Sequence, residues 1–163
     1  MAMNSENISC DIRNATYQDA EFILALRNQP EIVALGSSKK TVTLDEHEVW
    51  FKDALESDQH LIFIVTSVKA GDPIGYSRLV RSGEVGAVIT IALSELWRGR
   101  SIGSAMIERT AQAGFDRWSS VDYILAYILD GNMRSVNSFK KIGFKSTTEF
   151  PMQGHQVLVL RRR

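Results

Sequence analysis

The sequence contains only one cysteine, Cys10. A lone cysteine forms no internal disulfide, so the fold must depend on a hydrophobic core rather than on covalent cross-links. The chain has 163 residues, of which 44% are hydrophobic, and is long enough to bury such a core. We therefore expect a single domain over residues 1–163, in a reducing, cytoplasmic compartment.

An excess of charge and long hydrophobic runs are also absent. Lysine plus arginine and aspartate plus glutamate number 19 each, which excludes an overall basic field for nucleic acid or anionic membrane. No apolar run approaches the roughly 20 residues that cross a bilayer, and the first residues lack the regions of a signal peptide. We expect no nucleic-acid or membrane partner, and any phosphate binding must be local.

Apolar side chains recur with two different periods. Strand-like alternation or short apolar runs occupy residues 8–13, 61–66, 74–80, 85–93, 121–129, 144–150 and 157–160. Helical spacing follows Thr16 and Thr43 and occupies residues 102–118 and 132–142. Asn28 and Pro30 should end the first helix, and Glu46 completes a capping box with Thr43. This order predicts an α/β or α+β fold, a mixed sheet of six or seven strands with helices on both faces.

The stretch from Ile89 to Ser104 is the most informative part of the chain. An apolar strand runs into a turn containing Gly99 and then directly into an amphipathic helix. The first N–H groups of such a helix have no partner within it, so an anion placed there meets several donors and the positive end of the helix dipole. Arg98 and Arg100 add two full charges. We therefore predict that this turn binds phosphate groups.

Two stretches resemble the GCN5-related N-acetyltransferase (GNAT) family, whose members pass the acetyl group of acetyl-CoA to an amine. The family's phosphate loop has Arg or Gln, two residues, Gly, one residue, and Gly or Ala. Residues 98–103 match it with Ser101 in place of the first glycine, and serine suits the start of a helix. Residues 132–144 match a second motif, Asn132, a helix and a Gly-Phe pair, but Phe139 replaces a tyrosine that often protonates the leaving thiolate. The resemblance implies the GNAT fold, with a sheet that splays open centrally.

The same resemblance implies how the co-substrate acetyl-CoA is held. The backbone of Ile91 and Leu93 would pair with the pantetheine arm like an added strand. The residues expected at the diphosphate are Arg98, Gly99, Arg100, Ser101, Gly103 and Ser104. Asn132 would bond the pantetheine, and Phe139 would either line the thioester pocket or pack in the core. No metal is expected.

The front of the chain further resembles those family members that acetylate amino sugars carried on nucleotides. The matching residues are Ile12-Arg13, Asp19-Ala20, Arg27-Asn28, Pro30-Glu31 and His47-Glu-Val-Trp-Phe51. Ribosomal-protein N-terminal acetyltransferases and some amino-acid or polyamine acetyltransferases share parts of this pattern, so their acceptors remain alternatives. The candidate acceptor residues are Arg27, Asn28, His47, Trp50 and Arg78. Each also has a structural interpretation, as a helix cap, a core residue or a surface arginine.

The expected chemistry is direct attack of a neutral amine on the thioester carbonyl, polarised by a strand N–H near Leu93. His47 and Tyr127 are the candidates for handling protons. An amine of pKa about 8 costs roughly 1.4 kcal/mol to deprotonate at pH 7, against roughly 4.6 for lysine, so a weakly basic small-molecule acceptor is favoured. Because Phe139 has no proton to give, the residues also fit a non-catalytic CoA-binding module that serves a partner protein. Either would act as a monomer or homodimer.

Overall fold

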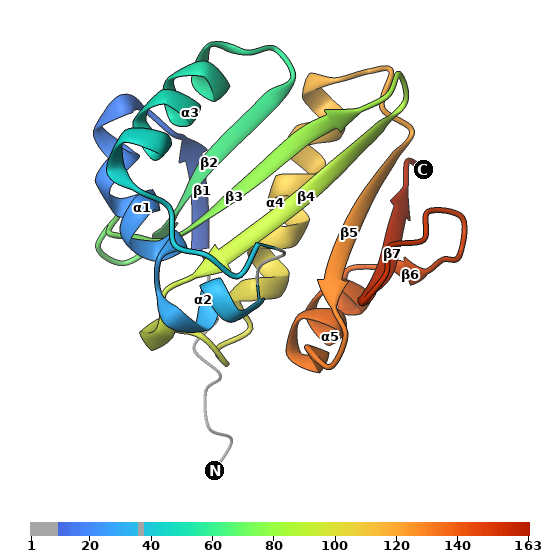
Figure 1. Ribbon diagram of the computed structural model, residues 1–163. Coiled ribbons are helices and arrows are strands. Elements are labelled where there is room, and N and C mark those ends of the chain that lie inside the picture. The colour runs from blue at the N-terminus through green and yellow to red at the C-terminus, as the bar shows by residue number, and fades with distance from the viewer. Residues whose placement is uncertain (1–9, 36–37) are drawn as a thin grey trace.

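A computed structural model describes residues 10–35 and 38–163 of the chain. Its elements, drawn in Figure 1, are β1 (Cys10–Asn14), η1 (Tyr17–Asp19), α1 (Ala20–Arg27), α2 (Pro30–Leu35), α3 (Leu44–Glu56), β2 (His60–Ser67), β3 (Pro73–Ser82), β4 (Gly86–Leu93), η2 (Glu95–Trp97), α4 (Ile102–Arg117), β5 (Tyr123–Leu129), α5 (Met133–Lys141), β6 (Lys145–Ser146) and β7 (His155–Arg161). None of the helices in these ranges is both long and apolar enough to cross a lipid bilayer.

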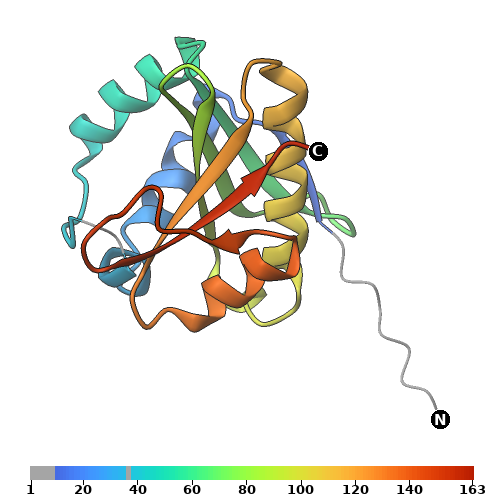
Figure 2. The ribbon, with the colours of Figure 1, turned by 90° about the vertical axis from the view of Figure 1, so that its right-hand side faces the viewer.

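The strands form one seven-stranded sheet in the order β1-β2-β3-β4-β5-β7-β6. All neighbours are antiparallel except β4 and β5, which run parallel and are joined through α4. Figure 2 shows α4 on one side of the sheet and α1 and α3 on the other. The predicted mixed sheet with helices on both faces is therefore confirmed.

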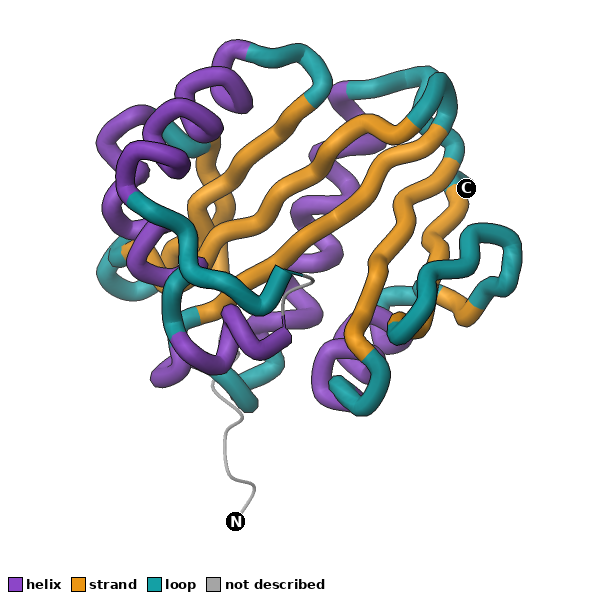
Figure 3. Tube along the Cα trace, in the orientation of Figure 1, coloured by secondary structure: helices purple, strands orange, loops and turns teal. Residues whose placement is uncertain are grey.

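The sheet opens between β4 and β5. These strands pair only at Gly86 with Tyr123, Ala87 with Ile124 and Val88 with Leu125, although β4 continues to Leu93 and β5 to Leu129. Figure 3 shows the two strands diverging along the rest of their length. Among the described residues, the far half of β4 thus keeps β3 on one side and has no strand partner on the other.

Each face of the sheet has its own apolar core. On one face, α4 and α5 pack on alternate residues of β3, β4 and β5, including Leu79, Ile89 and Ile124. On the other face, α1 and α3 cover Ile62 and Ile64 of β2, together with Tyr76 of β3 and Ala92 of β4. Because successive strand residues point to opposite faces, the side chains of β4 divide between the two cores. Helices α1 and α3 therefore stand on the face opposite α4.

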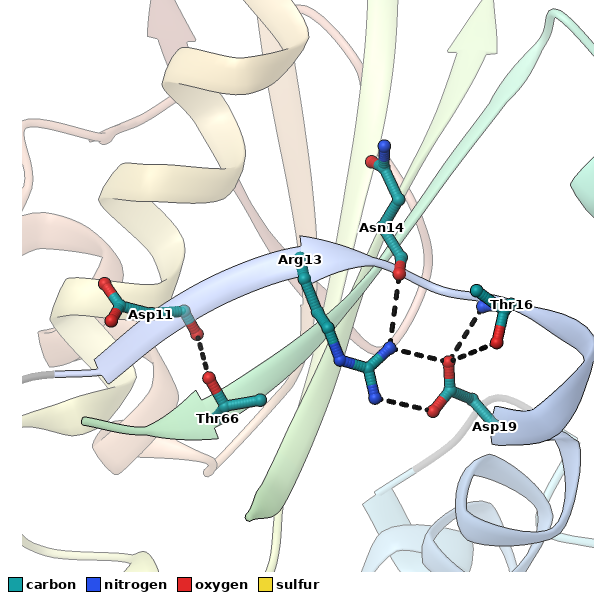
Figure 4. A network of polar contacts seen from close by, with 6 residues as sticks. All are labelled: Asp11, Arg13, Asn14, Thr16, Asp19 and Thr66. Atoms are coloured by element: carbon teal, nitrogen blue, oxygen red, sulfur yellow. Dashed lines mark hydrogen bonds and ion pairs between the residues drawn. The ribbon is translucent and has the colours of Figure 1, made fainter. Parts of the chain in front are cut away.

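The start of α1 is tied to β1 by the polar network in Figure 4. Arg13 donates from its two terminal nitrogens to the two oxygens of Asp19, both at 2.8 Å, and the Thr16 amide donates to the same carboxylate at 2.8 Å. The Arg13 guanidinium holds the pKa of Asp19 below its ordinary value. This buried carboxylate fixes where the first helix leaves the sheet.

Two elements, α2 and β6, differ from the sequence predictions, and the start of a third lies outside the described residues. Pro30 does not merely end the first helix but begins α2, because proline is well suited to a first helical turn. The strand predicted over residues 144–150 shrinks to Lys145–Ser146. The first strand begins at Cys10, and the start predicted for it at Ile8 lies outside the described residues. The capping box of Thr43 and Glu46 at the start of α3 is confirmed.

Candidate functional site

The turn before α4 presents backbone N–H groups around a tight bend. Gly99 has φ 73° and Ser101 has φ 62°, so two residues of the turn adopt the left-handed conformation. Successive backbone N–H groups in such a bend form a concave anion site that leads into the positive end of the helix. The sequence led us to expect a serine that caps the helix, but the Ser101 side chain makes no capping hydrogen bond. Its left-handed backbone conformation is also strained for a residue other than glycine.

The unpaired edge of β4 exposes backbone groups of alternate residues. The Ser94 amide donates to the Ile74 carbonyl on β3. Leu93, the residue before Ser94, lies opposite Gly75 in the strand register. Because antiparallel residues alternately face toward and away from their partner strand, Leu93 and Ile91 direct their backbone groups away from β3. These groups point into the gap between β4 and β5, which is the arrangement required to add an extended ligand as a further strand.

A cavity of about 720 Å³ joins this edge to the turn. Seven of the residues predicted to bind the donor line it, namely Ile91, Leu93, Arg98, Gly99, Ser101, Gly103 and Asn132. The other three do not: Arg100 is exposed and lies over the ring of Trp97, the buried Ser104 donates to the carbonyl of Ser138 on α5, and Phe139 lines a second cavity described below. Asn132 caps α5 by accepting from the Ser135 amide at 3.3 Å.

The side chain of Arg98 is occupied within the protein. Its Nε donates to the Leu93 carbonyl at 3.0 Å, and its terminal nitrogens contact Glu31 and Gln29 at the start of α2. This arginine therefore ties together the end of β4, the turn before α4 and the start of α2. One backbone acceptor of the β4 edge is consequently paired with a side chain.

A second cavity of about 190 Å³ lies where β4 and β5 separate. Tyr127 and Phe139 line it, together with Asn132 and the β4 segment Ile89–Ile91. Phe139 is only 2% exposed and packs edge-on against Phe144, with ring centroids 5.0 Å apart. Phe139 therefore belongs to the core and also borders this cavity.

Four of the five predicted acceptor residues gather in one cluster on the α1 and α3 face. The guanidinium of Arg27 lies 4.6 Å from the ring centroid of Trp50, and that of Arg78 lies 5.2 Å from the same ring. The His47 ring lies beside Trp50 in a tilted arrangement, with ring centroids 5.8 Å apart. The segments are far apart in the sequence, and they meet because α1 packs on β3 while α3 packs on α1 and on β2.

The ring of His47 is completely buried and both of its nitrogens are engaged. Arg27 always donates, so the His47 Nδ1, 3.3 Å away, accepts, and Nε2 carries the proton and donates to the Ala20 carbonyl at 2.8 Å. Burial, the largest influence, lowers the pKa of His47. In this arrangement the neutral imidazole orients Arg27.

Arg78 is mostly buried and lacks a partner for its Nε among the described residues. Burial lowers its pKa, Tyr76 opposes that effect, and the nearby Arg27 adds to it. His60, on the neighbouring strand, also has a buried and unpaired Nδ1, and burial together with Arg78 lowers the pKa of its ring. The cluster is therefore positively charged and incompletely hydrogen-bonded.

Asn28, the fifth predicted acceptor residue, has a different environment. Its side-chain amide donates to the Val42 carbonyl at 2.8 Å and accepts from the Val42 amide at 2.7 Å. It thereby anchors the segment that leads to α3.

The sequence interpretation missed Ile32 and Leu35 of α2, which line both cavities. The signal was Pro30 followed by a short apolar run, which is typical of a helix with proline in its first turn.

Comparison with known proteins identifies the family. Residues 11–145 match the model of the acetyltransferase (GNAT) domain. The chain therefore belongs to the GNAT family, whose members are N-acetyltransferases that use acetyl-CoA, and the strand order and open sheet described above are the GNAT fold. No curated protein matches the chain significantly in sequence.

Solved structures show the same fold at low sequence identity. A domain from Methanocaldococcus jannaschii aligns with a TM-score of 0.82 at 19% identity, covering 96% of this chain and 100% of that one. The aminoglycoside acetyltransferase AAC(6')-Ib, in complex with coenzyme A and kanamycin, aligns with a TM-score of 0.79 at 18% identity, covering 94% and 95%. The spermidine N-acetyltransferase from Vibrio cholerae, in complex with CoA and spermine, aligns with a TM-score of 0.77 at 19% identity, covering 93% of each chain. These likenesses support the fold and distinguish no subgroup.

Proposed function

We propose that this enzyme, acting as a single domain, transfers the acetyl group of acetyl-CoA to the primary amine of a small or nucleotide-linked amino sugar. The observation that carries the proposal is the continuous cavity from the turn at Gly99 and Ser101 to the unpaired edge of β4. The turn would hold the diphosphate through backbone N–H groups, and Ile91 and Leu93 would hydrogen-bond the amides of pantetheine. Complexes of structural relatives with coenzyme A support this placement.

The acetyl group would then lie in the gap between β4 and β5. A backbone N–H of the β4 edge, at or near Leu93, would polarise the thioester oxygen, and the amine would attack from the face that carries α1 and α3. Holding both reactants in this gap supplies much of the rate, because the reaction no longer waits for a productive encounter. The chain's contribution is therefore chiefly to position the two substrates.

This scheme requires little acid–base assistance from protein side chains. Phe139 has no acidic proton, and a thiol leaving group with a pKa near 8.5 needs little assistance at neutral pH. Tyr127 borders the same small cavity and is our candidate for passing a proton. His47 is assigned to positioning instead, because its two nitrogens are bonded to Arg27 and Ala20.

The acceptor preference rests on the cluster around Trp50. An aromatic ring flanked by arginines suits a sugar or base joined to phosphate. The acceptors named for the structural relatives are different, kanamycin for one and a polyamine for another. Peptide N-termini and amino acids remain the alternative acceptors. The free, buried thiol of Cys10 suits the cytoplasm, where we place the enzyme.

The proposal is tested by measuring release of free CoA from acetyl-CoA in the presence of free and nucleotide-linked amino sugars, amino acids, spermidine and a peptide. We expect turnover with a sugar amine, with formation of the N-acetylated product by mass spectrometry. Ser101→Asp should raise the KM for acetyl-CoA by roughly 10- to 100-fold, because a carboxylate would face the diphosphate, and Asp tolerates the left-handed conformation.

The matched control is Ser119→Asp, in an exposed turn after α4 and away from both cavities. It should leave the KM for acetyl-CoA unchanged. Equal effects of the two substitutions would contradict the assignment of the turn, and an absence of CoA release with every amine would refute the proposed reaction.

A further inference from the structure

Two cations share one aromatic ring on the acceptor face. Arg27 of α1 and Arg78 of β3 lie 4.6 Å and 5.2 Å from the centroid of the Trp50 ring, which belongs to α3. Like charges that lie so close repel each other, and burial strengthens the repulsion because less water screens it. A folded protein keeps such a pair when the ring, or a bound anion, compensates for it.

The protein supplies little negative charge to this pair. Within residues 10–35 and 38–163, the ion pairs of the protein involve other arginines, and neither Arg27 nor Arg78 takes part in one. Glu48 acts weakly on the neighbouring His47, but its side chain is exposed. The Nε of Arg78 is buried and unpaired in the described part of the chain. An anion would complete the hydrogen bonding of this cluster.

The cluster lies next to the expected reaction centre. Arg78 is paired directly with Thr90 across β3 and β4, so the two side chains emerge on the same face, about 5 Å apart at their Cβ atoms. Thr90 lines the small cavity between β4 and β5, where Tyr127 also lies. An anion held by Arg78 would therefore lie within one small molecule's length of an amine placed in that cavity.

We propose that Arg27 and Arg78, assembled around Trp50, bind an anionic group of the acceptor, so that the natural substrate is a small amine carrying a carboxylate or a phosphate. This inference rests on the proposed acetyl transfer and narrows its substrate class. The planar guanidinium groups can each donate two hydrogen bonds to such an anion. His47 acts as a positioning residue, since its Nδ1 holds Arg27 in place.

The same charges discriminate against polycations. A polyamine such as spermidine would place ammonium groups beside two buried guanidinium groups, and this repulsion disfavours its binding. The inference thus separates this chain from the Vibrio cholerae structural relative, which is described as a spermidine N-acetyltransferase.

The test compares acceptors that differ only in the anion. Steady-state CoA release is measured with glucosamine 6-phosphate against glucosamine, with amino acids against their amides, and with spermidine. We expect at least one anionic acceptor to exceed its neutral analogue in kcat/KM by roughly 10- to 100-fold, as charge-assisted hydrogen bonds provide. The two pairs distinguish phosphate from carboxylate as the group recognised. Equal rates within every pair, or a preference for spermidine, would overturn the inference.

Three variants locate the effect. Arg78→Met removes the charge while preserving bulk, and should abolish the anion preference by raising the acceptor KM with little change in the KM for acetyl-CoA. Arg78→Lys keeps a point charge without the planar fork and should retain part of the preference, which also guards against a folding defect in the methionine variant. The matched control is Arg81→Met on the same strand, since Arg81 contacts Ser120 and Trp118 instead. A preference that survives in Arg78→Met would refute the assignment.

A binding measurement separates this inference from the proposed reaction. Inorganic phosphate and glutarate are titrated calorimetrically into protein saturated with CoA, so that the turn before α4 is already occupied. Binding that is weakened at least tenfold by Arg78→Met, without turnover of any amine, would uphold the anion site and refute the transferase proposal. Turnover of amines without such binding, and without any anion preference, would uphold the transferase proposal and refute the anion site.

Discussion

At the scale of single residues, His47 shows how burial decides the role of a titratable side chain. Its spacing along α3 placed it on the apolar face, which fits either a catalytic or a structural residue. In the folded protein its Nε2 donates to Ala20 and its Nδ1 accepts from Arg27. Protonation of Nδ1 would create a second cation facing Arg27 and abolish that acceptor, so the native structure requires the neutral ring.

This requirement predicts a loss of stability on acidification. Burial lowers the pKa of His47 in the folded protein, whereas the unfolded chain should have a value near 6.5. Below about pH 6.5 the unfolded state therefore binds more protons than the folded state, and the free energy of unfolding falls as the pH decreases. We expect the denaturant midpoint to fall between pH 6.5 and pH 5, and to fall less steeply in His47→Gln.

His60 contributes in the same direction, because burial and the nearby Arg78 lower its pKa as well. The fall should therefore be reduced but not eliminated in His47→Gln. His155→Gln, at the start of β7, serves as the control and should keep the slope of the parent protein. A slope in His47→Gln identical to that of the parent would contradict this account of His47.

At the scale of elements, the beginning of α4 carries a cost that the sequence does not reveal. Ser101 has φ 62° and makes no side-chain capping bond. The left-handed conformation costs an L-residue about 1–2 kcal/mol, and the greater unfolded-state freedom of glycine offsets about 0.5–1 kcal/mol of that. We expect Ser101→Gly to raise the free energy of unfolding by about 0.5–1 kcal/mol, measured by denaturant titration.

Two comparisons sharpen this prediction. Ser101→Ala keeps the backbone strain and should show no gain in the free energy of unfolding. Ser101→Gly should bind CoA at least as tightly as the parent protein, since the N–H groups of the turn remain. A loss of stability in Ser101→Gly would mean that the serine hydroxyl supports the turn in a way that the geometry does not show.

The elements were predictable to the extent that their signals were local. The capping box of Thr43 and Glu46 and the period of α4 depend on neighbours in the chain, and both appear in the structure. The short helix α2 was hidden because Pro30 can either end one helix or begin another. Strand β6 was overestimated because Phe144 and Phe150 owe their burial to packing against Phe139 and Tyr123, while only Lys145 and Ser146 pair with β7.

The candidate site was predictable only in part, for a similar reason. The turn before α4 is one contiguous motif, and its residues Gly99, Ser101 and Gly103 line the large cavity. The meeting of Arg27, Trp50 and Arg78 depends on how α1 packs on β3 and α3 on α1 and β2, which no local pattern encodes. Each of these residues could be named from the sequence, but their contact could not be.

At the scale of the whole molecule, the open sheet leaves half of β4 with one strand neighbour. Backbone groups at Ile91 and Leu93 point into the gap, and amides without a partner exchange quickly with solvent. If the donor adds to this edge as a strand, saturating CoA should slow hydrogen exchange in residues 89–94 at least tenfold, measured by mass spectrometry. Strand β2, paired on both sides, should show little change. Unaltered exchange in residues 89–94, at a CoA concentration shown to saturate, would contradict the added-strand arrangement.

Helix α2 lines both cavities through Ile32 and Leu35, and Glu31 and Gln29 connect it to Arg98. If the two cavities hold the two substrates as proposed, this short helix borders both of them. A mutation that reshapes α2 to admit another acceptor would then also disturb donor binding, so acceptor specificity could not change there independently. In the same arrangement, divergence toward new amines is easier at Arg78 of β3 and Trp50 of α3, which line neither cavity.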